Sequence, residues 1–547
     1  MVFVAALYFP TLGFGLTYDD ALIVADDRAL AEFSPRDLVR VSGRVVRTAS
    51  LWLDRALFGE PPGGYHLQNL LWHAGAVLLL FAYVRRTTRS DLIAYATAVF
   101  FAALPVHVEA VANISNRKEL LCLFFSLAAL LSYDRFLTAR STPRLIGTAV
   151  LGYLAIQSKE VAAMLPLAFL LHERFFVTEE DRWLTKRASV QFAIVAVFLA
   201  AAAWFARQSV PGDDLLRIKN LAGFEGEVSW AKLIYTSGKA FCMYLSMLVL
   251  PTDLTPDHTV RLEESLVNAG TLAGFGILAA LLGIAIALRR HAPLSFGIAW
   301  FLVWYLPLSN WIPSSYIVAE RYLYVPSVGF CLAIGWLAST GFRTGGLSRG
   351  LAAVGFLGVV GFATLQTATY QHAWRDDETL WSYVYDRDPG SAKAATALGQ
   401  LAAKRNDPSR ADAYYREAIA ANPNYTPAWY DLGNSLFARR AFDDAIEAYT
   451  KAIELMPGFA AAYVNRATAH VQQQRYDAAL EDFGHAIRIQ PELAEARLNR
   501  GLLLLGLKRF EEAAADLEIA VRALPGNANA RAKLEEARSK INPSAGS

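Results

Sequence analysis

The sequence predicts an all-α fold, in which a polytopic membrane domain of about 11 transmembrane helices precedes an α-solenoid. Three observations lead to this prediction. The 547 residues are 54% hydrophobic and have a mean hydropathy of +0.27, which is too apolar for an ordinary soluble protein of this length. Long apolar runs fill residues 1–370 and are missing from residues 371–547. The second part instead repeats itself with a period of 34 residues.

The apolar runs define the candidate membrane spans. They are residues 2–16, 68–84, 91–105, 119–137, 145–157, 160–172, 188–206, 268–288, 293–308, 322–340 and 349–368. Several are shorter than the roughly 20 residues of a standard spanning helix. The first run has no basic segment before it, so it is predicted as a membrane helix and not as a secretory signal. It is short, so it is either tilted or preceded by further residues.

Basic residues in short loops predict the orientation. They are Arg85, Arg86, Arg89, Arg135, Arg140, Arg144, Lys186, Arg187, Arg289, Arg290, Arg343 and Arg349. If these loops are cytoplasmic, the positive-inside rule places the other loops and everything after residue 368 outside the membrane. The loops alternate between the two sides of the membrane only if the ambiguous segment 231–250 does not cross it and is re-entrant or interfacial.

The repeats have the tetratricopeptide signature, because small residues and prolines recur at a spacing of 34. The prolines are Pro389, Pro423, Pro457, Pro491 and Pro525. We expect a membrane domain in residues 1–370, a connector in 371–390, four repeats in 391–526, and a capping helix with a tail in 527–547. Stacked helix pairs form a concave groove that suits another polypeptide.

Asp19 and Asp20 follow the first apolar run directly. A carboxylate beside apolar surface is desolvated and can act as a general base. The alternative is that both acids cap a helix or face water.

The next outer loop carries His107 and Glu109. Because they are two residues apart, both point to one side if the segment is extended. With an acid of the first loop, they could bind a divalent cation such as Mg²⁺ or Mn²⁺, or orient a base. A hydrogen-bonded structural histidine is the alternative. Arg117 and Lys118 lie outside against the charge trend, which favours anion binding over a snorkelling anchor.

Two further clusters lie at predicted membrane boundaries. Lys159 and Glu160 interrupt two apolar runs, where charges need partners or a function. Lys159 suits a lipid phosphate, or else a carboxylate that stabilises a turn. Arg321, in the last outer loop, could clamp a phosphate beside two tyrosines.

Other function classes have little support. Arg36, Arg40, Arg44 and Arg47 share one helical face, which is explained by an amphipathic helix on the outer surface or by guidance of an anionic headgroup. The net charge of +2 gives no reason to expect nucleic acid as a partner. Phosphate-loop, Rossmann and nucleophile-elbow patterns are missing. Three distant cysteines form no disulfide or zinc framework.

These motifs, in this order, resemble the transmembrane and tetratricopeptide repeat protein O-mannosyltransferases, which are GT-C glycosyltransferases. The matching segments are YDD (18–20), PPGGYHLQN (61–69), HVEAV (107–111), NRKELL (116–121), SKE (158–160), AERYLYVPS (319–327) and WRDDETLW (374–381). The resemblance covers nearly the whole chain, although residues 207–230 match loosely.

The resemblance implies transfer of a sugar, by analogy mannose, from a polyprenyl phosphate to Ser or Thr hydroxyls with inversion. It implies that Asp19 is the general base, that Asp20 supports it or binds metal, and that His107 and Glu109 lie near the reacting phosphate. It also implies that Lys159 and Arg321 neutralise the leaving phosphate, with Arg117 as a further candidate. We expect a bacterial inner-membrane protein whose active site and repeats are periplasmic.

Two alternatives stay open. One is a lipid-linked oligosaccharide ligase, which would attach a long glycan in place of one hexose. The other is a non-catalytic membrane scaffold, in which the repeats bind a partner and the charged clusters have no catalytic role.

Overall fold

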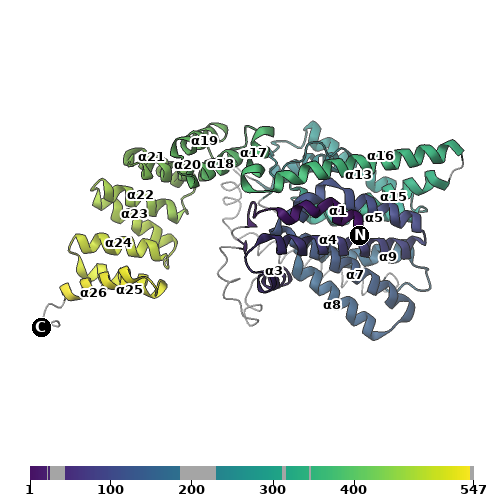
Figure 1. Cartoon of the computed structure of the whole chain (residues 1–547), viewed down its shortest axis with the longest axis horizontal. Helices are drawn as coiled ribbons and strands as arrows, with labels where there is room; N and C mark the ends of the chain where they lie inside the picture. Colours follow the sequence, from purple (N-terminus) through teal and green to yellow (C-terminus); the bar gives the residue numbers. More distant parts are fainter. Residues whose placement is uncertain (21–22, 25–43, 185–228, 311–315, 344–345, 542–547) are drawn as a thin grey trace. The chain divides into compact units, whose positions relative to one another are not determined.

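The computed structural model describes residues 1–20, 23–24, 44–184, 229–310, 316–343 and 346–541. These residues form helices and no strand (Figure 1), so the predicted all-α class is confirmed. The chain divides into two compact units. The first ends at Arg387 and the second begins at Asp388.

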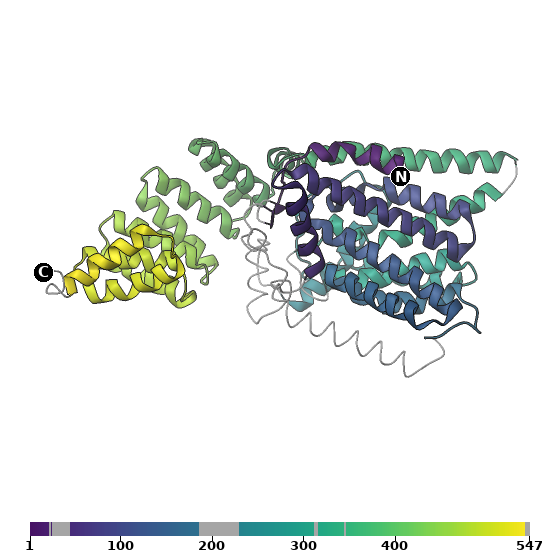
Figure 2. The same cartoon turned by 60° about the horizontal axis from the view of Figure 1, so that its bottom comes forward.

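The helices of the first unit match the apolar runs. In chain order they are α1 (Val2–Tyr8), η1 (Phe9–Gly13), α3 (Val45–Phe58), α4 (Pro62–Thr88), α5 (Asp91–Ala103), η4 (Pro105–His107), α6 (Val108–Ala112), η5 (Ile114–Asn116), α7 (Arg117–Ala139), α8 (Thr142–Ser158), η6 (Glu160–Met164), α9 (Leu165–Phe176), α12 (Trp230–Val249), α13 (Ala269–Ala287), α14 (Ala292–Tyr305), η7 (Leu306–Leu308), η8 (Glu320–Leu323), α15 (Ser327–Arg343), α16 (Gly346–Tyr370), η9 (Gln371–Trp374) and α17 (Asp377–Arg387). Figure 2 shows α1 lying along α16, with which it makes contact. Of the predicted spans, 188–206 lies outside the described residues.

Four helices in the described part are long and apolar enough to cross a membrane. They are Pro62–Thr88, Ile114–Ala139, Ala269–Ala287 and Gly346–Trp374. The pair Asp91–Ala103 and Pro105–Ala112 passes the same test but is bent by 59°. The total of 11 spans therefore stays a prediction. Helix α12 is not among these four, and it is continuous, without the break of a re-entrant loop.

Glycines allow close packing between helices of the first unit. A Cβ atom on Gly274 of α13 would collide with the carbonyl oxygen of Gly238 in α12. Gly297 of α14 and Gly329 of α15 oppose one another in the same way. Small residues at such crossings are typical of helix pairs in membranes, where close backbone approach replaces hydrophobic driving force.

Two of the predicted cytoplasmic loops meet at one end of the bundle. Arg86, at the end of α4, forms an ion pair with Asp134, near the end of α7. The basic residues that follow these two helices therefore share one face, as the alternation of spans requires.

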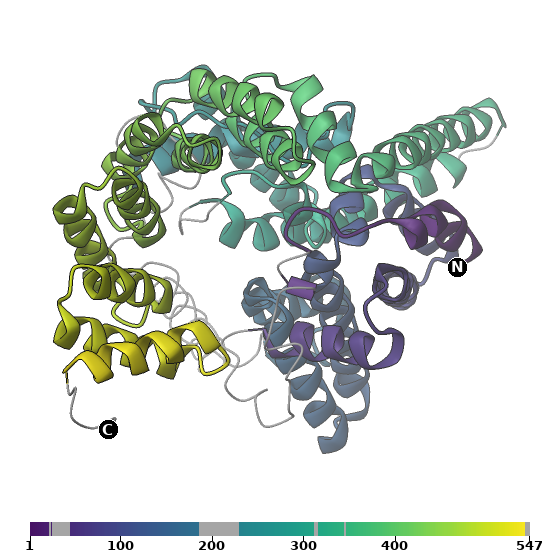
Figure 3. The ribbon, with the colours of Figure 1, turned by 60° about the vertical axis from the view of Figure 1, so that its left-hand side comes forward.

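The second unit contains four helix pairs and a closing helix, as the period predicts. They are α18 (Ala392–Lys404), α19 (Pro408–Ala421), α20 (Thr426–Ala438), α21 (Phe442–Leu455), α22 (Ala460–Gln472), α23 (Tyr476–Ile489), α24 (Ala494–Gly506), α25 (Phe510–Ala523) and α26 (Ala528–Ile541). Figure 3 shows the pairs following one another in a curved array from green to yellow. Each repeat proline lies two residues after a helix end, as Pro423 does after α19.

The small residue of each repeat has a defined neighbour. A Cβ atom on Gly433 would lie 2.5 Å from the Tyr449 ring, and one on Gly399 would lie 2.5 Å from the Tyr415 ring. The aromatic residue of the second helix thus packs directly on the backbone of the first. A small residue and a large apolar residue recur at these two positions every 34 residues, as Gly501 and Leu517 do in the fourth repeat, so similar packing builds successive repeats.

Candidate functional site

Asp20 joins the loop after the first apolar helix to η5, which directly precedes α7. It is completely buried. Its carboxylate accepts hydrogen bonds from the backbone N–H groups of Ser115 (2.7 Å), Ile114 (3.1 Å) and Thr17 (3.4 Å). Burial, together with repulsion from Asp19, raises the pKa of Asp20 to about 8, although these N–H groups oppose the shift. Asp20 therefore has the geometry of a structural acid that links two loops.

Asp19 has a different environment from its neighbour. It is only half-buried. Its Oδ1 accepts hydrogen bonds from Ser115 Oγ (2.5 Å) and Asn113 Nδ2 (3.5 Å). Within the described part of the chain, Oδ2 of Asp19 accepts no hydrogen bond. One oxygen is thus held in place and the other is left for a ligand, which is the arrangement a general base needs.

Glu109 of α6 and Arg321 of η8 form a buried ion pair between segments that are far apart in the sequence. Oε1 of Glu109 faces the guanidinium, and Oε2 accepts the backbone N–H of Arg321 at 2.7 Å. Both carboxylate oxygens are therefore occupied by one residue. Glu109 orients Arg321, whose guanidinium lies 4.6 Å from the ring centroid of Tyr316.

The predicted extended conformation of residues 107–109 is wrong. His107 ends the 3-10 helix η4, and Glu109 lies in α6. Successive residues on a helix are rotated by about 100°, so residues two apart face different ways. Nε2 of His107 lies 2.8 Å from Ser327 Oγ, and its ring lies 4.2 Å from that of Phe101. His107 is a buried, hydrogen-bonded histidine, which is the structural alternative named above.

The three residues suggested as metal ligands do not meet. His107 lies among aromatic rings, Glu109 is held by Arg321, and Asp20 is held by backbone amides. Among the described residues, no group of three His, Cys, Asp or Glu side chains is arranged to bind a metal ion. These side chains therefore do not fit the Mg²⁺ or Mn²⁺ site that the sequence suggested.

Lys159 is buried in an ion pair with Glu119 of α7. Its Nζ also lies 4.9 Å from the ring centroid of Tyr322. The carboxylate partner is thus not the adjacent Glu160, which pairs with Arg44 at 3.0 Å. Of the other arginines predicted on the same face, Arg36 and Arg40 lie outside the described residues.

Arg117 has a structural environment. Its guanidinium and the carboxylate of Asp54 are both completely buried and lie 2.5 Å apart. It also donates to Asn69 Oδ1 (2.7 Å), Tyr65 O (2.9 Å) and Ser50 Oγ (3.4 Å). These bonds tie α7 to α3 and α4. Arg117 is neither a snorkelling anchor nor placed to receive a phosphate, because it is shielded and its donors are engaged.

Lys118 is the lysine that faces the site. It is half-buried, and within the described residues it has no hydrogen-bond or ion-pair partner. The charged groups that act on it electrostatically include Arg44, Lys159 and Arg321. We call Arg44, Lys118, Lys159 and Arg321 the cation cluster. The other three each have a carboxylate partner, so Lys118 is the member of the cluster that has none among the described residues.

Tyrosines connect this cluster to the acid pair, Asp19 and Asp20. The hydroxyl of Tyr18 donates to the hydroxyl of Tyr316 at 3.0 Å, and the Tyr316 ring lies against Arg321. Ser115 makes a second connection. Its hydroxyl donates to Asp19, and it lies two residues before Arg117 in the chain. The four charged clusters that the sequence singled out therefore converge in one region of the first unit.

Beside this region and next to Arg321 lies Glu320, a buried acid to which the sequence analysis assigned no role. Its Oε1 accepts the backbone N–H of Thr255 at 2.6 Å and lies 3.4 Å from Nε2 of His258. Burial, and to a smaller extent Glu109, raises the pKa of Glu320 to about 7 against the opposing effect of His258. Glu320 thus attaches the loop between α12 and α13 to η8.

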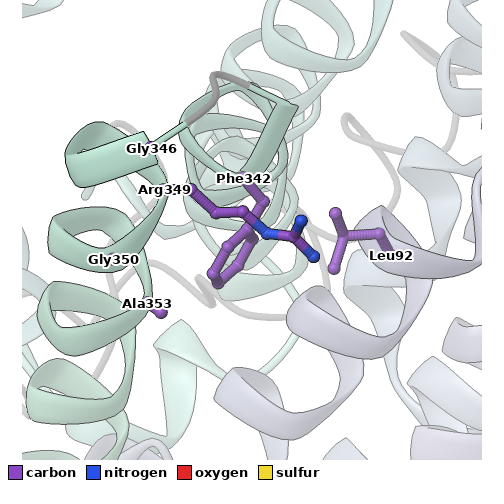
Figure 4. Close-up of a pocket in the computed structure, with 6 residues that line it drawn as sticks. All are labelled: Leu92, Phe342, Gly346, Arg349, Gly350 and Ala353. Atoms are coloured by element: carbon purple, nitrogen blue, oxygen red, sulfur yellow. The ribbon is translucent and has the colours of Figure 1, made fainter.

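A hollow of about 580 Å³ lies elsewhere. It is lined by Leu92, Phe342, Gly346, Arg349, Gly350 and Ala353 (Figure 4). These residues lie at the ends of α5, α15 and α16 that are opposite to Asp20, Glu109 and Arg321. The hollow shares no residue with the acid pair or the cation cluster.

The sequence analysis chose Arg117 over Lys118 as a phosphate-binding residue. It did not identify Asp54 as the partner of Arg117, Glu119 as the partner of Lys159, or Tyr316 as the partner of Tyr18. Adjacent helix residues point about 100° apart, so only one of two neighbouring cations can face the site. The motif NRKELL contains both, and no signal in it decides between them. Glu119 lies 40 residues from Lys159, and Tyr316 lies 298 residues from Tyr18, so local spacing carries no trace of these pairs.

The first unit combines convergent charged residues with helices that are long and apolar enough to cross a membrane, and helix pairs of the tetratricopeptide type follow it. Comparison with known families agrees. Residues 47–205 match the dolichyl-phosphate-mannose-protein mannosyltransferase family. Residues 396–460 and 464–528 match the tetratricopeptide repeat family. The resemblance that the sequence motifs indicated is confirmed by these two domains.

The curated relatives that the chain matches are named as protein O-mannosyl-transferases. A protein O-mannosyl-transferase of Caenorhabditis elegans is 27% identical over 399 residues, covering 70% of this chain and 54% of the relative. Protein O-mannosyl-transferase TMTC3 of Homo sapiens is 24% identical over 487 residues, covering 79% and 52%. TMTC4 of Homo sapiens is 27% identical over 413 residues, covering 65% and 55%. The chain spans about half the length of the curated relatives it matches.

Among solved structures, the crystal structure of MamA is similar to a part of the chain. It is 19% identical, covers 33% of this chain and 96% of that chain, and has a TM-score of 0.26.

Proposed function

We propose that this protein is an inverting glycosyltransferase that moves one sugar from a polyprenyl phosphate to Ser or Thr hydroxyls of exported polypeptides. Mannose is the proposed sugar, by analogy with the names of the relatives. The observation that carries the proposal is the convergence of a half-exposed carboxylate, Asp19, with the cation cluster. A lipid-linked phosphate donor and a hydroxyl acceptor need these two kinds of group.

Asp19 is the proposed general base. Its free Oδ2 takes the proton of the acceptor hydroxyl, and the hydroxyl oxygen attacks the anomeric carbon. The bond from that carbon to the phosphate oxygen breaks on the opposite face, which inverts the centre. Ser115 holds Oδ1, so the base is pre-oriented before the acceptor arrives.

Lys118 is the proposed first contact of the leaving phosphate. Negative charge accumulates on that phosphate in the transition state, and a cation without a protein partner stabilises it most. Lys159 and Arg321 supply further positive charge near Lys118, and each also forms an ion pair with a buried carboxylate. Arg117 is not included, because its charge is matched by Asp54.

No step is assigned to a metal ion. The residues suggested by the sequence, Asp20, His107 and Glu109, do not form a ligand set. Asp20 supports the reaction by holding the loop that carries Asp19.

The repeats are the proposed binding surface for the acceptor polypeptide, because stacked helix pairs present an extended concave face. We further propose that the acid pair and the repeats are extracytoplasmic, in a bacterial inner membrane. The ion pair between Arg86 and Asp134 supports this orientation, since it places two basic loops at one end.

The experiment is transfer by the purified full-length protein, wild type and Asp19→Asn, with polyprenyl-phosphate mannose and a periplasmic extract. Each reaction is run with and without EDTA, and products are read by mass spectrometry. The proposal expects one hexose on Ser or Thr in the wild type and its loss in the variant. A panel of other lipid-linked sugars identifies the donor if mannose is not transferred.

Three outcomes contradict the proposal. Full activity of Asp19→Asn excludes it as the base. A long glycan on the product indicates an oligosaccharide ligase. No transfer from any donor, with partner binding kept by variants of the charged clusters, indicates a membrane scaffold.

A further inference from the structure

The backbone at Tyr18 is strained. Its φ is +62°, in the left-handed region that residues with bulky side chains rarely occupy. Tyr18 directly precedes the acid pair, so its conformation sets the direction in which the next residue leaves. A strained conformation of this kind persists only when surrounding contacts hold it, and such strain is found most often at functional sites.

Besides the hydrogen bond to Tyr316, Tyr18 makes contacts with α17, which follows the last apolar helix. Its backbone N–H donates to Asp377 Oδ1 at 2.8 Å. Its ring stacks on that of Trp381, with centroids 5.3 Å apart and planes inclined by 20°. A second hydrogen bond, close to the one that Asp377 accepts, runs from the N–H of Gly15 to the carbonyl oxygen of Arg375 at 2.8 Å. The segment WRDDETLW is thus attached to the loop that carries Asp19.

The N-terminal hydrogen bond of helix α17 comes from Asp376 and not from Asp377. Asp376 caps the helix, because its Oδ1 accepts the backbone N–H of Thr379 at 2.8 Å. Asp376 also pairs with Arg375 at 2.9 Å and makes no described contact with the first loop. Two adjacent aspartates therefore have separate tasks, one within α17 and one directed at Tyr18.

We propose that Asp377 and Trp381 are positioning residues of the transfer reaction, which hold Tyr18 in its left-handed conformation and thereby direct the Asp19 carboxylate. The inference rests on the proposed function of Asp19. Neither residue touches the reacting atoms. Their effect is on the geometry of the base, so it belongs to the rate of the chemical step and not to donor binding.

The test compares Asp377→Ala, Asp377→Asn and Asp376→Ala in the purified full-length protein. Three quantities are measured: kcat and KM with polyprenyl-phosphate mannose, the melting temperature, and hydrogen exchange of a peptide that covers residues 14–20. Asparagine keeps an oxygen acceptor at Oδ1 but not the negative charge, so it separates loss of the hydrogen bond from loss of the charge. Trp381→Phe and Trp381→Ala test the stacking in the same way.

We expect Asp377→Ala to lower kcat by roughly 10- to 100-fold with little change in KM, as a misplaced catalytic group does. Exchange at the Tyr18 amide should rise, and Asp377→Asn should restore most of both losses. Asp376→Ala should lower the melting temperature, because it removes the helix cap, while kcat changes less than in Asp377→Ala.

Two results overturn the proposal. The first is wild-type kcat in Asp377→Ala together with faster exchange at Tyr18, since the loop would then be released without consequence. The second is a fall in kcat that matches the loss of melting temperature equally in Asp376→Ala and Asp377→Ala. If the wild type transfers no sugar from any donor, the proposed function fails and the positioning role fails with it. The exchange data then still report separately whether Asp377 restrains the first loop.

Discussion

Asp20 and Ser115 are joined by a hydrogen bond of 2.7 Å from the Ser115 backbone N–H to the Asp20 carboxylate. The bond ties the loop after the first apolar helix to the start of α7, 95 residues further along the chain. It gives the second of two adjacent acids a structural task. The first acid, Asp19, is left half-exposed with one unengaged oxygen.

This division predicts opposite phenotypes for the two acids. Asp19→Asn should lower transfer by about 10²- to 10⁴-fold, because a general base contributes that much, and should leave the melting temperature unchanged. Above pH 8, where Asp20 is ionised, Asp20→Asn should lower the free energy of unfolding by about 1–3 kcal/mol, because an amide group cannot accept all three buried N–H groups. Transfer assays and thermal melting in detergent measure both. Equal effects of the two variants on transfer and stability would contradict the division.

A second prediction concerns Lys118 and Arg117. Lys118→Met should raise KM for the lipid-linked donor by roughly 10- to 100-fold, since a hydrogen bond to a charged group is worth about 1.5–3 kcal/mol. Arg117→Met should instead destabilise the fold by about 3–5 kcal/mol, because it leaves the buried Asp54 without its partner. Donor titrations and melting curves distinguish the two.

The matched control is a double variant, Arg117→Met with Asp54→Leu. Removing both members of a buried ion pair avoids the isolated charge, so much of the stability should return. A rise in donor KM for Arg117→Met at unchanged stability would assign phosphate binding to Arg117 after all.

A third prediction is a pH dependence that originates at Glu320. Its pKa of about 7 in the folded protein lies above the ordinary value of 4.5, so the folded state holds a proton that the unfolded state releases. The contribution is fully present below pH 4.5 and is lost as pH rises through 7, to a total of roughly 3 kcal/mol.

The measurement is the melting temperature of wild type and Glu320→Gln between pH 4.5 and 8. The wild type should lose stability over this window, and the variant should lose less, because glutamine does not titrate. Asp20, with a pKa of about 8, has the same sign and remains in both proteins. Parallel curves for the two proteins would refute the assignment to Glu320.

The fourth prediction tests the packing of the repeats. Gly433→Ala places a Cβ atom 2.5 Å from the Tyr449 ring, and such overpacking should cost about 1–3 kcal/mol. Gly506 is also helical, and its Cβ would have nothing within 4 Å. Gly506→Ala should therefore be neutral or stabilising by up to about 1 kcal/mol, through the better helix propensity of alanine.

The third repeat suggests the rescue for this prediction. It carries Ala467 and Phe483 where the second repeat has Gly433 and Tyr449. The double variant Gly433→Ala with Tyr449→Phe copies that combination. Without the hydroxyl, which donates to Asn434 Oδ1 at 2.9 Å, the ring is free to shift away from the new Cβ atom, so part of the stability should return. Urea or thermal unfolding of the full-length protein measures each variant, and equal effects of Gly433→Ala and Gly506→Ala would contradict the packing argument.

Local patterns were sufficient for the architecture. Apolar runs and basic loops predicted where the helices of the first unit lie, because helix formation and membrane burial depend on residues close together in the chain. The spacing of Gly399, Gly433 and the prolines predicted four repeats, because each repeat packs only on its neighbours. Ordered motifs also indicated the family resemblance.

The sequence by itself therefore determined the fold class, the repeat register and the charged clusters that gather at the site. The tertiary structure decided which member of each pair faces the site: Asp19 and not Asp20, Lys118 and not Arg117. It also decided that His107 and Glu109 diverge. These choices depend on helix phase and on partners such as Asp54 and Ser115. Such partners come close only after the chain has folded, so spacing along the sequence does not encode them.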